Sequence, residues 1–162
     1  MDGRGGTHFA HPTNRFYPAL AAAGITGYEV DRAAGMTAAD RAHLVARGVG
    51  ITNLVARATA RASELSREEL REGGERLLQF VAAHRPAVVA IAGISAYRDA
   101  FGERGAALDR QPDTLDSAIY WSGAALWVVP NPSGLNAHET VVTLAAAYAA
   151  PAAEASVIGG SS

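Results

Sequence analysis

The chain contains no cysteine and no lysine. Without cysteine there can be no disulfide, no thiolate nucleophile and no cysteine ligand for zinc or an iron–sulfur cluster. All fourteen basic residues are therefore arginines, and the arginine guanidinium does not lose its proton to become an amine nucleophile. Schiff-base catalysis by a lysine side chain is excluded as well.

Long apolar runs are also missing. No stretch of the sequence approaches the roughly 18 apolar residues of a membrane span, and residues 1–6 lack the apolar core of a signal peptide. We therefore expect a cytoplasmic protein with no membrane partner. Abundant alanine, with arginine in place of lysine, is typical of a high-GC bacterial genome. The formal net charge is only −2, so contact with nucleic acid would depend on local arginines and main-chain amides rather than on a global positive field.

Length and composition fit one globular domain. Of the 162 residues, 49% are hydrophobic and 19% are charged, a profile typical of a chain that buries a core. We assign this domain to residues 1–150. Residues 151–162 are small and polar, which predicts a disordered tail.

Apolar spacing and capping residues predict alternating helices and strands. Helices are expected at 14–23, from a Thr37–Asp40 cap to near Gly48, from a Ser66–Glu69 capping box to Pro86, at 95–101 and at 137–149. Strands are expected at 50–55, 87–93 and 124–129, with a short one at 118–121. The apolar run at 87–93 does not alternate, as in buried parallel strands. The sequence thus predicts a three-layer α/β/α sandwich with a mostly parallel central sheet.

Sheets of this kind place their sites in loops at the carboxyl ends of strands. Two loops qualify, one after Val55 and one after Val129. The second contains Pro130 followed by Asn131-Pro132-Ser133-Gly134-Leu135-Asn136. Its two prolines fix backbone angles, Gly134 permits close approach, and the next helix would present free amides suited to a phosphate. Leu135 is an apolar side chain in this polar loop, which solvent exposure does not explain. A role in binding and simple packing back into the core explain it equally well.

A second cluster lies at residues 8–17, where two histidines, an arginine and three aromatic residues precede and open a helix. Aromatic faces beside polar groups suit a flat nucleobase. Helix-core packing is the favoured interpretation of Phe16 and Tyr17. A metal site formed by His8 and His11 is disfavoured, because no third ligand lies nearby in the sequence.

Taken together, three segments resemble the mismatch-specific uracil/thymine DNA glycosylases, a family within the uracil-DNA glycosylase superfamily. These segments are His8-Phe9-Ala10-His11-Pro12-Thr13-Asn14-Arg15-Phe16-Tyr17, Gly50-Ile51-Thr52-Asn53-Leu54-Val55 and Asn131-Pro132-Ser133-Gly134-Leu135. The resemblance runs in order from residue 6 to about residue 149.

The resemblance implies a uracil-DNA-glycosylase fold and a cofactor-free, metal-free hydrolase of base excision repair. Such an enzyme, acting as a monomer, flips uracil or thymine mispaired with guanine out of double-stranded DNA and hydrolyses the bond between base and sugar. Phe9 matches the aromatic residue that stacks on the flipped base, and Asn131 the polar residue that lines the pocket. Pro132, Ser133, Gly134 and Leu135 match the loop that enters the duplex, with Leu135 filling the gap.

One family motif has no counterpart in the chain. The family's first motif, Gly-hydrophobic-Asn-Pro-Gly, carries the asparagine that positions the attacking water and normally ends the first strand. The expectation is therefore an N-terminally truncated domain without its first strand, with a true start upstream of Met1. The family often has a basic residue downstream of the inserted leucine. In this chain the sequence Asn136-Ala137-His138 stands there instead.

Two other functions stay open at this point. A module that binds DNA without releasing a base would keep Phe9 and the inserting loop but lack the water-positioning asparagine. An unrelated nucleotide-binding domain of flavodoxin type is disfavoured, because the sequence has no phosphate-loop signature. Base preference among uracil, thymine and other damaged bases is not encoded in any pattern that we recognise.

Overall fold

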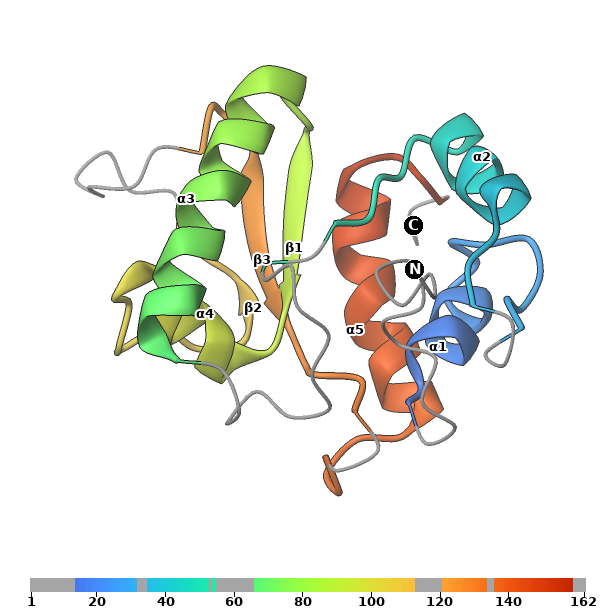
Figure 1. The fold of residues 1–162 in the computed structure, drawn as a ribbon. Helices are drawn as coiled ribbons and strands as arrows, with labels where there is room; N and C mark the ends of the chain where they lie inside the picture. The colour runs from blue at the N-terminus through green and yellow to red at the C-terminus, as the bar shows by residue number, and fades with distance from the viewer. Residues whose placement is uncertain are drawn as a thin grey trace. The chain divides into compact units, whose positions relative to one another are not determined.

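The computed structural model describes residues 14–31, 35–52, 54, 66–112, 121–133 and 136–158. They fall into two compact units, one formed by Met1–Thr52 with Asn131–Ser162 and the other by Asn53–Pro130. Figure 1 labels the elements of both units, five helices and three strands among the described residues.

The second unit is built on a small mixed sheet. Strand β1 (Val88–Ala92) pairs in parallel with β3 (Ala125–Val129), and Val88 lies opposite Ala125. Strand β2 (Asp109–Arg110) pairs antiparallel with β3, which gives the order β1-β3-β2. The two apolar strands and their parallel pairing confirm the prediction. Strand β2 was not predicted, because its two exposed residues carry no apolar pattern. Of the short strand expected at 118–121, residues 118–120 lie outside the described residues and Trp121 is irregular.

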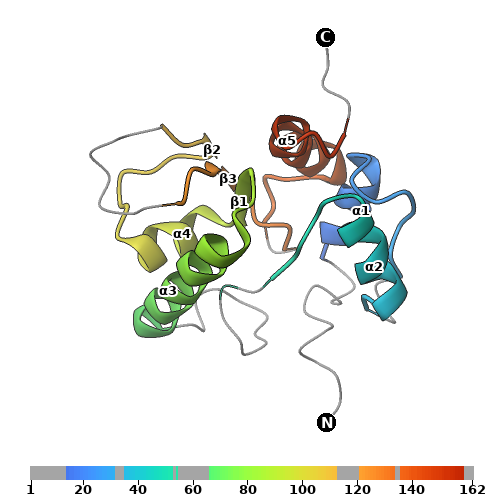
Figure 2. The same cartoon turned by 90° about the horizontal axis from the view of Figure 1, so that it is seen from above.

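Helices α3 (Arg67–His84) and α4 (Ile94–Phe101) pack against one face of this sheet, as Figure 2 shows from above. The buried cluster joins Ile91, Leu126, Val128 and Tyr97, with Leu77 of α3 packed against it. Ala90 has the opposite orientation on its strand and is exposed. Burial of the strand on both faces, expected from its unalternating sequence, is therefore not observed at Ala90.

Helix α3 begins where its capping box predicted. The Ser66 hydroxyl accepts from the Glu69 amide at 3.1 Å, and the Glu69 carboxylate accepts from the Ser66 amide at 3.3 Å. Midway along the helix, Gly73 allows a close approach of another segment. A Cβ at Gly73 would lie 1.8 Å from the main-chain oxygen of Leu54, so a side chain is sterically incompatible there.

The first unit contains α1 (Phe16–Ala22), α2 (Ala38–Ala46) and α5 (Val141–Glu154). The Thr37–Asp40 capping box opens α2 as predicted. Helices α1 and α5 share a core that includes Tyr17 and Leu144, which are 2% and 0% exposed.

Two predicted boundaries are wrong. Helix α5 continues through Pro151 to Glu154, where we expected a disordered tail from residue 151. Proline lacks the amide for one helical hydrogen bond, but Pro151 and Ala152 are buried, and this packing favours the extra turn. Residues 50–52 and Leu54 are irregular rather than a strand. Gly50 and Thr52 are exposed, so this segment lacks the burial that would stabilise one.

The structure is consistent with an α/β fold of uracil-DNA-glycosylase type. The three-layer sandwich, and the absence of a first strand, stay predictions. Among the described residues, no helix combines the length and apolar character needed to cross a membrane.

Candidate functional site

The candidate loop begins two residues after β3 ends, at Asn131. The Asn131 side-chain oxygen accepts a hydrogen bond from the Ser133 amide at 3.0 Å, which closes a local turn of the kind that asparagine favours. Between them, the Pro132 side chain is fully buried. Proline also fixes its own backbone angle, so the first three residues of the loop are anchored by packing and by a hydrogen bond.

This turn determines which part of the Asn131 amide group can meet a ligand. The Ser133 N–H can only donate, so the side-chain oxygen must face it and the amide nitrogen must face elsewhere. That nitrogen is a donor only. A half-buried donor at this position suits a carbonyl acceptor, such as those on the ring of uracil or thymine.

Asn136 closes the far end of the loop. Its amide nitrogens donate to the other end: the main-chain N–H to the Ser133 carbonyl at 3.0 Å and the side-chain group to the Asn131 carbonyl at 3.3 Å. The segment between, Gly134 and Leu135, lies outside the described residues. Its two flanks, however, are hydrogen-bonded to each other, so the loop ends are held at a fixed separation.

Arg15 braces the same loop from the residue that precedes α1. One terminal nitrogen of its guanidinium donates to the Ser133 carbonyl and also, at 2.9 Å, to the Asn136 carbonyl. The other terminal nitrogen donates to the Glu139 carbonyl. The Arg15 main-chain amide donates to the Pro132 carbonyl at 3.0 Å. One residue thus binds four carbonyls, spaced over residues 132–139.

Helix α5 begins later than predicted, and this changes its role. It starts at Val141 rather than near Ala137, because Thr140 is the capping residue and accepts from the Thr143 amide at 3.2 Å. Residues 136–139 form turns before it. The amides of its first turn therefore do not directly follow the loop, and a phosphate site made of loop plus helix start, which the sequence suggested, is not supported.

Two aromatic residues of the second sequence cluster, Phe16 and Tyr17, serve the core. Tyr17 is buried, and the Phe16 ring packs edge-on against Tyr148 of α5 at a centroid distance of 6.1 Å. Burial, and then the nearby Glu139 carboxylate, raise the pKa of the Tyr148 hydroxyl far above its usual value, against the effect of Arg15. Tyr148 therefore stays neutral at physiological pH, and the favoured interpretation of Phe16 and Tyr17 is confirmed.

Of the residues proposed from the sequence, the structure describes Asn131, Pro132 and Ser133 and brings them next to Arg15. Phe9, Gly134 and Leu135 lie outside the described residues, as do His8 and His11. Sequence reasoning missed Arg15 and Asn136 as structural partners of the loop. An arginine and an asparagine have many roles, and their pairing spans more than 115 positions, so no local pattern could have identified it.

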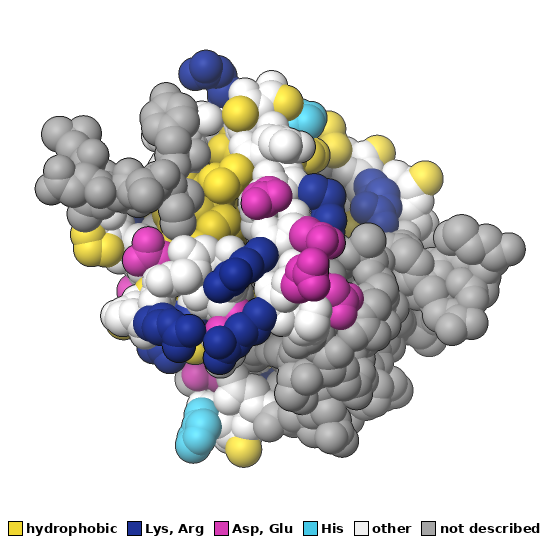
Figure 3. Space-filling model, turned by 60° about the vertical axis from the view of Figure 1, so that its left-hand side comes forward, with side chains coloured by type: hydrophobic (Ala, Val, Ile, Leu, Met, Phe, Trp, Pro, Cys, Tyr) yellow, Lys and Arg dark blue, Asp and Glu magenta, His cyan; other side chains and the backbone are white. Residues whose placement is uncertain are grey.

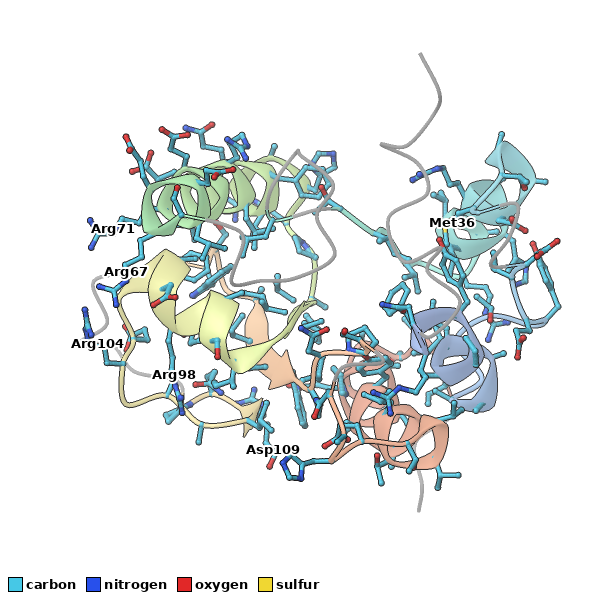
Figure 4. The ribbon with its side chains drawn as sticks, turned by 60° about the horizontal axis from the view of Figure 1, so that its bottom comes forward. Met36, Arg67, Arg71, Arg98, Arg104 and Asp109 are labelled. Carbon is cyan, nitrogen blue, oxygen red and sulfur yellow. The ribbon has the colours of Figure 1, made fainter. Side chains whose placement is uncertain are left out.

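Several arginines described in the second unit are bonded to neighbouring groups. On the face shown in Figure 3, arginine side chains lie close to acidic ones. Figure 4 labels four arginines on α3, α4 and the loop after α4, namely Arg67, Arg71, Arg98 and Arg104. Arg67 lies 3.9 Å from the Asp99 carboxylate, and Arg98 donates to the Ala106 carbonyl at 2.6 and 2.9 Å. In the part of the chain that is described, no group of three or more potential metal ligands occurs.

A comparison with protein families gives one match over almost the whole chain. The family model described as the uracil DNA glycosylase superfamily matches residues 1–152. The match includes the braced loop and the residues before α1. It therefore covers both parts of the site that the hydrogen bonds join.

Proposed function

The chain belongs to the uracil DNA glycosylase superfamily, and we propose that it is a mismatch-specific uracil/thymine DNA glycosylase of base excision repair. The superfamily indicates a hydrolase that acts on DNA and releases uracil. The narrower assignment is that the base is uracil, or thymine, mispaired with guanine in a duplex, and that the enzyme works as a monomer without a metal or cofactor.

The observation that carries this proposal is the braced loop with Asn131 at its start. Extruding a base from a duplex costs a few kcal/mol of stacking and pairing, which an apolar side chain inserted in the gap partly recovers. A loop that enters a duplex must therefore keep its conformation against this free-energy cost. The hydrogen bonds from Arg15 and Asn136 fix both flanks of Gly134 and Leu135, which suits insertion by Leu135.

Within this proposal, the residues have separate roles. Phe9 stacks on the extruded base. The Asn131 amide nitrogen donates to a carbonyl oxygen of the base, on which negative charge develops as the bond to the sugar breaks. Water attacks the C1′ carbon of the sugar, the bond from C1′ to the base nitrogen breaks, and the base leaves with the bonding electrons and takes up a proton. Because the chain has no lysine, the reaction ends at an abasic site.

The test is base release by the purified chain from matched 30-mer duplexes. These carry G·U, A·U, G·T or only normal pairs, and a single strand with one uracil serves as a fifth substrate. Alkaline cleavage of the product strand reports abasic sites. We expect release from G·U above all other substrates and none from normal duplex.

Two results would contradict the proposal. Equal rates on G·U, A·U and single-stranded uracil would show a glycosylase without mismatch preference. Duplex binding with no release from any substrate would favour the module that binds DNA without catalysis.

A further inference from the structure

We propose that Arg15 is a positioning residue that holds the loop ready to enter duplex DNA. This inference rests on the proposed function, since it assigns Arg15 to the duplex-insertion step of that reaction. Arg15 does not touch the base or the sugar in this proposal. Its effect passes through the main chain of residues 132–139.

The position of the bonded carbonyls supports this role. Ser133 and Asn136, whose carbonyls share one guanidinium nitrogen, stand on either side of Gly134 and Leu135 in the sequence. The Glu139 carbonyl, bonded to the other nitrogen, anchors the chain on its way to α5. Arg15 therefore fixes both ends of the two-residue segment assigned to insertion, from a single rigid group.

Arginine is the side chain suited to this task. The guanidinium is planar and holds its donors in a fixed fork, whereas a lysine ammonium is a single point charge on a flexible stem. The partners are main-chain oxygens, which no substitution of loop side chains can remove. These bonds also direct the negative ends of three loop carbonyls at Arg15, so they do not face the phosphates of a bound duplex.

An unbraced loop would have to be ordered each time it enters DNA. Ordering then reduces affinity and rate, because backbone freedom is lost at the binding step. A braced loop has already lost that freedom on folding. The inference therefore predicts an effect on duplex substrates specifically, since a single strand needs no insertion.

The chain offers a matched control. Arg47, in the same unit, donates to the Ile25 and Gly24 carbonyls at 2.6 Å each and braces another loop. None of the hydrogen bonds described for Arg47 reaches residues 131–139. Arg47→Met removes the same type of bond, so it measures the general consequence of losing an arginine brace.

The first measurement is amide hydrogen exchange followed by mass spectrometry on the full chain. Arg15→Met should speed exchange in residues 131–139 and leave residues 24–27 as in the wild type. Arg47→Met should do the reverse. This measurement does not depend on catalysis, so it tests the brace itself; unchanged exchange at 131–139 in Arg15→Met would overturn the inference.

The second measurement compares kcat/KM on the G·U duplex and on single-stranded uracil. Displacement of a positioned group by about 1 Å can cost on the order of 100-fold. We therefore expect Arg15→Met to lose roughly 10- to 100-fold on the duplex and much less on the single strand. Arg47→Met should keep the wild-type ratio of the two.

Arg15→Lys distinguishes the effect of the forked guanidinium donors from the effect of the positive charge. It also tests the inference if Arg15→Met fails to fold. It keeps the charge but cannot reproduce the fork, so the duplex rate should fall nearly as far as with methionine. Full restoration by lysine, or an equal loss on both substrates, would overturn the inference. A wild-type chain that releases no base contradicts the proposed function, whereas an active wild type with an unaltered ratio in the Arg15 variants contradicts the positioning role alone.

Discussion

Asn131 carries two functions that a single substitution can separate. Its side-chain oxygen holds the Ser133 amide at 3.0 Å, and its amide nitrogen is the group proposed to donate to the base. Asn131→Asp keeps an oxygen acceptor for the turn and replaces the donor with a second oxygen. Asn131→Ala removes both groups. We therefore expect the two variants to differ in their combination of stability and activity.

The expected sizes follow from these contacts. Losing one neutral hydrogen bond in a half-buried turn costs about 0.5–1.5 kcal/mol. In a chain of 162 residues, each kcal/mol shifts Tm by roughly 2–4 °C, so Asn131→Ala should lower Tm by about 1–6 °C. Asn131→Asp should keep Tm within about 2 °C of the wild type, since a carboxylate oxygen can still accept from the Ser133 amide. For catalysis, loss of one donor at a developing charge costs about 100- to 1,000-fold.

The assays are thermal unfolding by circular dichroism and single-turnover release from the G·U duplex. We expect both variants to lose release by at least about 100-fold, with Asn131→Asp the slower because its carboxylate faces a departing anion. An aspartate variant with near wild-type release would refute the reasoning. It would show that Asn131 is a turn residue only and that another group meets the base.

Three further predictions concern other parts of the chain. Leu135→Ala should slow release from duplex more than from single-stranded DNA, and equal losses on the two substrates would assign Leu135 to the core instead. Gly73→Ala should lower the free energy of unfolding: helix propensity gains about 1 kcal/mol, but a Cβ 1.8 Å from the Leu54 carbonyl adds strain of about 1–3 kcal/mol or more. Gly74→Ala, whose nearest neighbour would lie at 3.1 Å on a Phe101 side chain, is the milder control in the same melts. The Tyr28 hydroxyl, then the Thr37 amide, lower the pKa of Asp40, so its contribution to stability is present above the unfolded pKa and is lost as pH falls through the folded one. The Tm difference between wild type and Asp40→Asn should accordingly shrink on acidification, and a constant difference from pH 7 to pH 2.5 would refute this.

The sequence predicted elements whose determinants are local. The Thr37 and Ser66 capping boxes each depend on residues three positions apart, and both form as expected. The apolar runs at 87–93 and 124–129 became the paired strands of the sheet. In these places, local preference and tertiary packing favour the same structure.

Tertiary packing decided the elements that were mispredicted. Helix α5 passes through Pro151 because Pro151 and Ala152 are buried, and no local rule reports that burial. Asn136 was read as a departure from the family pattern, yet it ties the two ends of the loop together. For the candidate site, local chemistry identified the loop after β3. The brace from Arg15 depends on a contact between residues far apart in the chain, so it could only be found in the structure.

The use of arginines as braces has a consequence for how the DNA affinity of this protein depends on salt concentration. Binding to DNA releases condensed counterions only where a cation of the protein reaches a phosphate. Each such contact adds about −0.9 to the slope of log affinity against log salt concentration. Arg15, Arg47 and Arg98 direct their guanidinium groups at main-chain carbonyls, and Arg67 lies beside Asp99. The charges of Arg15, Arg47 and Arg98 serve the fold and are not available to neutralise phosphates, and the Asp99 carboxylate offsets part of the charge of Arg67. The affinity for duplex DNA should therefore fall with added salt much less steeply than fourteen arginines would suggest, and discrimination between sites should survive at ionic strengths that dissociate proteins bound mainly by charge.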